Sequence, residues 1–208
     1  MADITFFTHP MSRGQIARWA LHEAGADYEQ VLVGWDAKPA ELLAVNPLGK
    51  VPTIIHHAPW GERTVSEAAA VCAYLAAVYP DADLAPRDAE LADYFRWMFF
   101  AAGPVDQAMT AHSLGLEAPA DRQSLAGYGT YDLAVDTLEK AVSAQPYIAG
   151  DRFTAADVYV GSMVGWGMSF GLLPKRPAFE AYLGRVYERP AAVRAREIDD
   201  ALIAKASA

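Results

Sequence analysis

Two periodicities of apolar positions run through the first eighty residues of the chain. Short apolar, β-branched or aromatic runs predict strands, and apolar residues that recur every three or four positions predict helices. Strands are expected at 4–7, 28–33, 51–55 and 63–65, and helices at 12–24, 39–45 and 66–79. This order of elements predicts a mixed sheet covered by helices.

The pattern changes between Pro80 and Arg87, where prolines and charged residues gather as in a linker. Beyond this segment the strand pattern disappears. Helices are predicted at 88–111, 124–144, 154–170, 177–188 and 191–204. Gly103 and Pro104 are expected to bend or interrupt the first of these helices. The sequence therefore predicts an α/β domain over 1–80, a linker over 81–87 and an all-helical domain over 88–208.

The helix expected at 154–170 has a strongly specified start. Thr154 stands three residues before Asp157, which is the spacing of a capping box. Phe153 and Val158 occupy the positions of a hydrophobic staple around the same turn. We interpret this motif as structural and assign it no direct part in any chemistry.

Composition and charge narrow the class of protein. The chain has 208 residues, of which 53% are apolar and 21% charged, so it can form a hydrophobic core and is not predicted to be disordered. Its net charge of −9 disfavours binding to nucleic acid or to an anionic membrane surface, because both attract Lys and Arg. An anionic small ligand remains compatible with this charge, since a helix N-terminus can bind it locally.

The single cysteine, Cys72, excludes an intramolecular disulfide and any cysteine-rich zinc module. No apolar run approaches the roughly 18 residues of a membrane-spanning helix, and the N-terminus does not resemble a signal peptide. We therefore expect a soluble, cytoplasmic protein without a metal site.

Four motifs in order resemble those of the cytosolic glutathione S-transferases. They are a sheet-forming first half, the segment Asn-Pro-Leu-Gly-Lys-Val-Pro at 46–52, Ser-Glu-Ala at 66–68 opening a helix, and the capping box at 154–157. The resemblance covers nearly the whole chain. It implies a thioredoxin-like N-terminal domain, an all-α C-terminal domain and a homodimer. It also implies that glutathione binds to the first domain and that a small hydrophobic electrophile binds between the two domains.

Within the segment 46–52, the resemblance implies that Lys50, Val51 and Pro52 belong to the glutathione site. In this family the proline is cis, and the preceding main chain pairs with the cysteinyl part of glutathione. The alternative is a trans proline that simply opens an edge strand.

Glu67 and Ala68 stand where the family binds the γ-glutamyl end of glutathione. A helix N-terminus suits the carboxylate of this group, and an acidic side chain suits its ammonium. Family members usually carry a hydroxyl residue after the acid, so Ala68 removes one hydrogen bond. The alternative is that Glu67 only complements the helix dipole.

The resemblance implies that a tyrosine, serine or cysteine near the end of the first strand activates the glutathione thiol. That strand has no tyrosine, and Cys72 lies inside a predicted helix, where it is expected to be a core residue. Thr8 and Ser12 remain as hydroxyl donors, and Ser12 resembles the catalytic residue of serine-type bacterial members. The alternative for Ser12 is a helix N-cap. His9 is a nearby candidate for shaping the site, with an incidental turn histidine as the alternative.

The leading functional prediction is a glutathione transferase that conjugates the glutathione thiolate to small hydrophobic electrophiles. A glutathione-dependent isomerase or peroxidase is an alternative, although the Ser-Ser-Cys motif typical of one isomerase group is absent around Ser12. A non-catalytic binding or scaffold protein is a further alternative, which Ala68 mildly favours.

Overall fold

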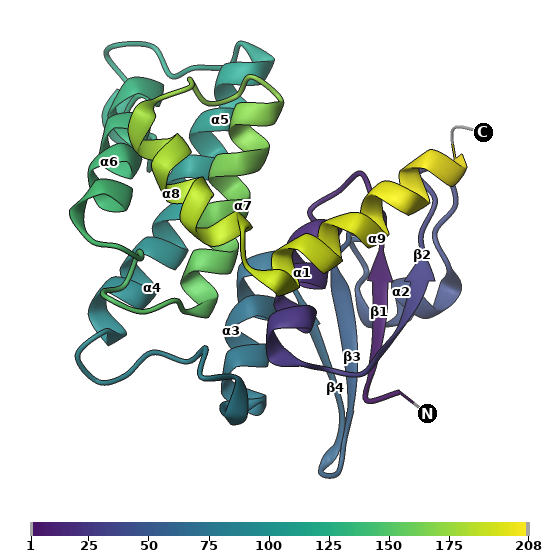
Figure 1. The fold of residues 1–208 in the computed structure, drawn as a ribbon. Coiled ribbons are helices and arrows are strands. Elements are labelled where there is room, and N and C mark those ends of the chain that lie inside the picture. Colours follow the sequence, from purple (N-terminus) through teal and green to yellow (C-terminus); the bar gives the residue numbers. More distant parts are fainter. Residues whose placement is uncertain (1, 207–208) are drawn as a thin grey trace. The chain divides into compact units, whose positions relative to one another are not determined.

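The computed structural model describes residues 2–206 (Figure 1). The chain forms two compact units. The first runs up to Ala85 and resumes at Glu188, and the second consists of Pro86–Tyr187. We describe each unit by itself.

The first unit contains the predicted mixed sheet. Its strands are β1 (Ile4–Thr8), β2 (Tyr28–Leu32), β3 (Thr53–Ala58) and β4 (Gly61–Ser66). They lie in the order β2-β1-β3-β4, in which β1 and β2 are parallel and the other neighbours are antiparallel. The predicted thioredoxin-like sheet followed by a helical region is confirmed.

Neighbouring residues of β1 point to opposite faces of the sheet, and buried apolar side chains lie on both faces. Helices therefore cover both faces. Phe7 packs with Val33 and with Leu42 of α2 (Ala40–Val45). Phe6 points to the opposite face, which is covered by α1 (Gly14–Ala24). The guanidinium carbon of Arg18, a residue of α1, lies 5.4 Å from the centre of the Phe6 ring. Helix α3 (Ala68–Val78) packs beside α1 on this second face.

The last helix, α9 (Pro190–Ala206), lies along α1 (Figure 1). The buried Arg18 Nε lies 2.9 Å from Asp199 Oδ1, and Arg189 forms two hydrogen bonds with Glu23. The sequence analysis grouped this helix with the helical domain, whereas it packs within the first unit. Helical periodicity identifies a helix without identifying its packing partner. The domain limits 1–80, 81–87 and 88–208 stay a prediction.

The second unit is helical. It contains α4 (Leu91–Phe100), α5 (Asp106–Leu114), α6 (Tyr131–Ala144), α7 (Ala155–Ser169) and α8 (Pro177–Tyr187). A π-helical segment at Ala101–Val105 joins α4 to α5 and contains Pro104. This wider turn accommodates a residue without an N–H and is the predicted interruption. Helix α6 begins later than predicted, after a short 3-10 segment at Gln123–Leu125.

The predicted capping box of α7 is present. The main-chain N–H of Thr154 donates to Asp157 Oδ2 at 2.9 Å. Asp157 also accepts hydrogen bonds from the N–H of Ile148 and the hydroxyl of Tyr182. The motif thus connects α7 to a preceding loop and to α8, a wider structural role than its spacing indicates.

Candidate functional site

The residues singled out in the first eighty positions meet at one end of the sheet. The strand registers pair Phe7 with Thr53 and Thr53 with Ser66. The end of β1, the start of β3 and the end of β4 therefore lie side by side. The turn that contains Ser12 follows the first, Val51 and Pro52 precede the second, and Glu67 follows the third. In Figure 1 this is the upper end of the sheet, toward which β1 points.

The peptide bond between Val51 and Pro52 is cis, as predicted. The loop before it is wound around the buried side chain of Asn46, whose Nδ2 donates to the Lys50 carbonyl and to Thr53 Oγ1. In the part of the chain that the structure describes, the main chain of Val51 enters no internal hydrogen bond. Val51 is therefore held by its neighbours with its own main-chain groups available to a ligand, whereas the Lys50 side chain is exposed.

Glu67 has a strained backbone, with φ +68° and ψ 119°. Such angles are unusual for a residue with a Cβ and cost on the order of 1–3 kcal/mol. Glu67 is the N-cap of α3, and its carbonyl accepts the N–H of Val71 at 2.9 Å. The exposed carboxylate of Glu67 thus lies at the helix N-terminus, beside the buried Ala68. Sequence reasoning found this residue but gave no sign of its strain.

Ser12 closes the turn that leads into α1. Its Oγ donates to the carbonyl of His9 at 2.7 Å and accepts the N–H of Gly14 at 3.0 Å. Arg13 is the N-cap residue of α1, so Ser12 lies one residue before the cap and satisfies the N–H of the first helical residue. The hydroxyl must rotate away from His9 before it can donate to a ligand's sulfur.

Thr8, the other hydroxyl near this turn, is fully buried. Among the described residues its Oγ1 has no hydrogen-bond partner. It lies against Gly14, where a Cβ would come within 2.1 Å of Thr8 Oγ1. Close packing at the start of α1 therefore requires glycine at this position.

A cluster of His9, Trp35 and Lys38 lies beside the same turn. The rings of His9 and Trp35 have their centres 4.1 Å apart, and Lys38 Nζ lies 5.6 Å from the centre of the Trp35 ring. A Cβ on Gly49 would lie 3.3 Å from Lys38 Cγ, so the lysine stem packs against the loop that leads to Val51. The sequence analysis did not single out Trp35 or Lys38, because their contact with this turn appears only in the folded chain, where the Trp35 ring is 58% exposed.

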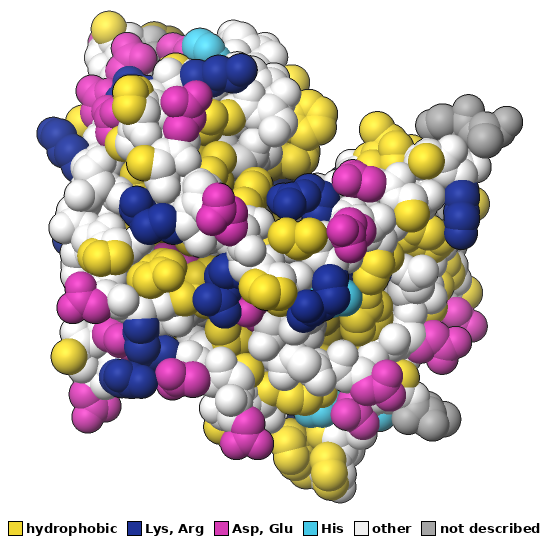
Figure 2. Space-filling view, in the orientation of Figure 1, with side chains coloured by type: hydrophobic (Ala, Val, Ile, Leu, Met, Phe, Trp, Pro, Cys, Tyr) yellow, Lys and Arg dark blue, Asp and Glu magenta, His cyan; other side chains and the backbone are white. Residues whose placement is uncertain are grey.

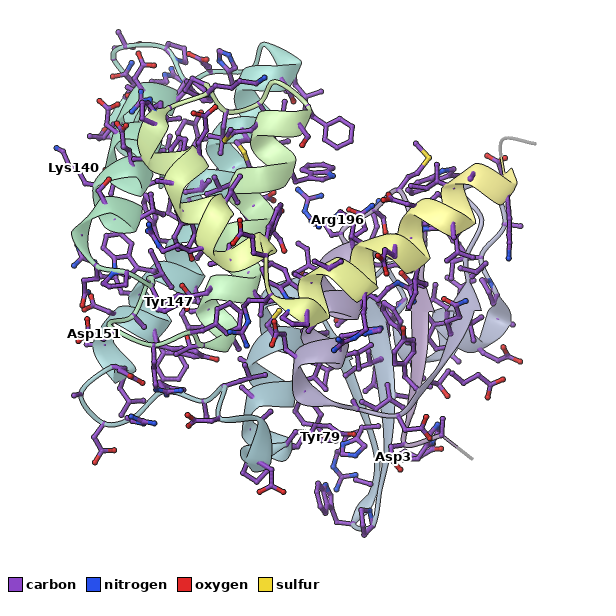
Figure 3. The ribbon with its side chains drawn as sticks, viewed as in Figure 1. Asp3, Tyr79, Lys140, Tyr147, Asp151 and Arg196 are labelled. Carbon is purple, nitrogen blue, oxygen red and sulfur yellow. The ribbon has the colours of Figure 1, made fainter. Side chains whose placement is uncertain are left out.

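At the opposite end of the sheet, a tyrosine lies near an aspartate. Figure 3 shows Asp3 and Tyr79 near one another, at the end where β1 begins. Burial, followed by the charge of Asp3, raises the pKa of the Tyr79 hydroxyl. These residues are separated from Ser12 and Val51 by the length of the strands.

The remaining reactive groups do not build a second centre. Cys72 is buried, and burial raises its pKa to about 12, which confirms it as an unreactive core residue. Among residues 2–206 no group of three His, Cys, Asp or Glu side chains is arranged to hold a metal ion. The helices of these residues include none that is long and apolar enough to cross a membrane. Figure 2 shows Lys and Arg interspersed with Asp and Glu on the face in view.

Two family models match the chain. The first, "Glutathione S-transferase, N-terminal domain", matches residues 2–77, and the second, "Glutathione S-transferase, C-terminal domain", matches residues 106–190. Glutathione S-transferase GstA of Escherichia coli O157:H7 is 26% identical over 192 residues, which cover 89% of this chain and 90% of that protein.

Solved structures give the same result. A glutathione transferase from Methylococcus capsulatus strain Bath has a TM-score of 0.76 at 26% identity, covering 95% of this chain and 98% of its own. A sphingomonad glutathione S-transferase complexed with glutathione has a TM-score of 0.74 at 28% identity, covering 94% of this chain and 98% of its own.

Proposed function

Since the chain belongs to the cytosolic glutathione S-transferase family, we propose that it conjugates the glutathione thiolate to small hydrophobic electrophiles. The observation that carries this proposal is the meeting of Ser12, Val51 and Glu67 at one end of the sheet. Each of these positions offers a different group to a different part of one tripeptide.

The main chain of Val51 pairs with the cysteinyl unit of glutathione, as one strand pairs with another. The Ala68 N–H at the start of α3 receives the γ-glutamyl carboxylate, and Glu67 binds the ammonium group. The strain at Glu67 supports a ligand role, because strained residues persist where function requires their position. Lys50 and Lys38 add positive charge for the remaining carboxylate.

Ser12 is the proposed donor to the glutathione sulfur. A hydrogen bond to the thiolate lowers the pKa of the bound thiol and so increases the reactive fraction. To donate in this way, the Ser12 hydroxyl exchanges the His9 carbonyl for the sulfur. We also propose a homodimer, and a sedimentation mass near the 22.5 kDa of one chain across micromolar concentrations would exclude it.

The same thiolate could serve a glutathione-dependent isomerase or a peroxidase, and loss of catalysis would leave a glutathione-binding protein. Calorimetry with glutathione comes first, followed by turnover with an activated aryl chloride and with an organic hydroperoxide. We expect binding and aryl conjugation. Conjugation without peroxide turnover favours the transferase, peroxide turnover alone favours the peroxidase, and the absence of glutathione binding contradicts the whole proposal.

Glu67→Gln tests the assigned site. Removing the charge that faces the ammonium group is expected to weaken glutathione binding by about 1–3 kcal/mol. Glu29→Gln is the matched control, because it removes another exposed carboxylate of the first unit, on β2. Equal affinity of Glu67→Gln and wild type would show that the start of α3 does not bind the γ-glutamyl group.

A further inference from the structure

His9 organises the turn between β1 and α1 through its side chain and its main chain together. The N–H of Met11 donates to His9 Nδ1 at 3.0 Å. The carbonyl of His9 accepts the N–H of Ser12 at 3.2 Å and its Oγ at 2.7 Å. The two residues that follow Pro10 are therefore both tied to His9.

The hydrogen bond from Met11 determines the tautomer of the imidazole. Because Nδ1 accepts a hydrogen bond, the ring proton of neutral His9 resides on Nε2. Burial lowers the pKa of His9, and the charge of Lys38 lowers it further. The ring is therefore neutral near pH 7 and can serve as an acceptor there.

The imidazole is also held from the segment that follows β2. The Trp35 ring lies against it, with the two planes inclined at 41°. Lys38 Nζ lies near the Trp35 ring and donates to the carbonyl of Gly34 at 2.8 Å. Lys38 is the charged group that faces His9 across this contact, and its charge opposes protonation of the ring.

We propose that His9 is a positioning residue for the turn between β1 and α1, which carries Ser12. The neutral imidazole stabilises this turn by accepting the N–H of Met11, and protonation at Nδ1 breaks that hydrogen bond. The proposal rests on the proposed function, because the glutathione sulfur is assigned to this turn. After protonation Nδ1 is a donor that faces the N–H donor of Met11, so the hydrogen bond is lost. Ser12 then loses its fixed place beside the sulfur.

Two variants, His9→Asn and His9→Ala, distinguish the role of His9 as hydrogen-bond acceptor for Met11 from the effect of its protonation. An Asn side chain can accept the N–H of the residue two positions later and does not ionise. An Ala side chain offers no acceptor. His112→Asn is the control, since it removes another partly exposed imidazole, on α5 of the second unit.

Activity is measured as kcat/KM for an activated aryl chloride at saturating glutathione, from pH 5 to pH 8. Below pH 6 the logarithm of kcat/KM for wild type and His112→Asn is expected to fall with a slope clearly above 1, because protonation of the thiol contributes 1 and protonation of His9 adds about 0.5 where it titrates. The slope for His9→Asn is expected to be 1. His9→Ala is expected to be about 10-fold less active at pH 7.5, the equivalent of one hydrogen bond.

The free protein gives a second readout that does not depend on turnover. The NMR resonance of the Met11 amide is expected to shift with the protonation of His9 in wild type and to stay constant in His9→Asn. A Met11 resonance that does not follow His9 overturns the proposal, as does the same acid slope in wild type and His9→Asn. If wild type neither binds nor conjugates glutathione, the proposed function fails, and the Met11 titration still decides whether His9 holds the turn.

Discussion

Replacing Asp157 by alanine tests a buried side chain of the second unit that accepts four hydrogen bonds. Asp157 is fully buried and accepts hydrogen bonds of 2.7, 2.8, 2.9 and 3.1 Å. The donors are the N–H of Ile148, the hydroxyl of Tyr182, and the N–H and hydroxyl of Thr154. Asp157→Ala removes the acceptor from all of them at once.

The size of the loss follows from how many donors stay buried without a partner. Losing a helix cap alone costs about 0.5–2 kcal/mol. A buried donor left unsatisfied costs about 1–3 kcal/mol, and Ile148, Thr154 and Tyr182 are each at most 1% exposed. We therefore expect Asp157→Ala to lower the free energy of unfolding by at least about 3 kcal/mol.

Chemical denaturation at one fixed protein concentration measures this change, and the m-value is expected to stay constant. Tyr182→Phe completes a double-mutant cycle with Asp157→Ala. The loss of unfolding free energy that Tyr182→Phe causes in wild type should largely disappear when Asp157 is already alanine. A loss below about 2 kcal/mol, or additive effects of the two substitutions, would refute a network and leave only a helix cap.

The pH dependence adds a second check. Burial raises the pKa of the Asp157 carboxyl in the folded protein, although its hydrogen bonds act in the opposite direction. The stabilisation linked to this group is therefore complete below its unfolded pKa and is lost as the pH rises through its folded pKa. The difference between wild type and Asp157→Ala should therefore decrease as the pH is raised above about 4, the ordinary pKa of an aspartate. A difference that increases over this range would contradict the raised pKa.

Three further substitutions test the site end of the sheet. Ser12→Ala should cost about 0.5–2 kcal/mol of stability if Ser12 stabilises the start of α1, which chemical denaturation measures. It should also raise the pKa of the bound glutathione thiol if Ser12 contacts the sulfur, which thiolate absorbance near 240 nm measures. Glu67→Gly should stabilise the fold by about 1 kcal/mol, because glycine tolerates a positive φ, while calorimetry shows weaker glutathione binding. Gly14→Ala should cost about 1–3 kcal/mol through its clash with Thr8 Oγ1, and Thr8→Ala should recover part of that loss in the double variant.

The secondary-structure elements and the local motifs could be predicted from the order of residues alone. Period-two and helical patterns gave the strands and helices of the first unit to within a few residues. Val51-Pro52 and the Thr154–Asp157 box were predictable because each depends on residues close together in the chain. Such local interactions leave a direct record in residue order.

The meeting of segments that are distant in the chain could not be predicted in this way. The strand registers bring Ser12, Val51 and Glu67 to one end of the sheet, and no local pattern encodes a register across fifty residues. The pairing of Arg18 with Asp199 spans most of the chain and places α9 in the first unit. The contact of His9 with Trp35 depends on the parallel pairing of β1 with β2.

The strain at Glu67 and the buried, unpartnered hydroxyl of Thr8 also emerged only in three dimensions. Both residues are ordinary in a sequence, since glutamate and threonine occur in many turns and strands. Their surroundings in the fold differ from those of such ordinary residues, because Thr8 Oγ1 lies against Gly14 and Glu67 turns the chain from β4 into α3. Long-range packing thus gave these residues properties that their local sequence does not contain.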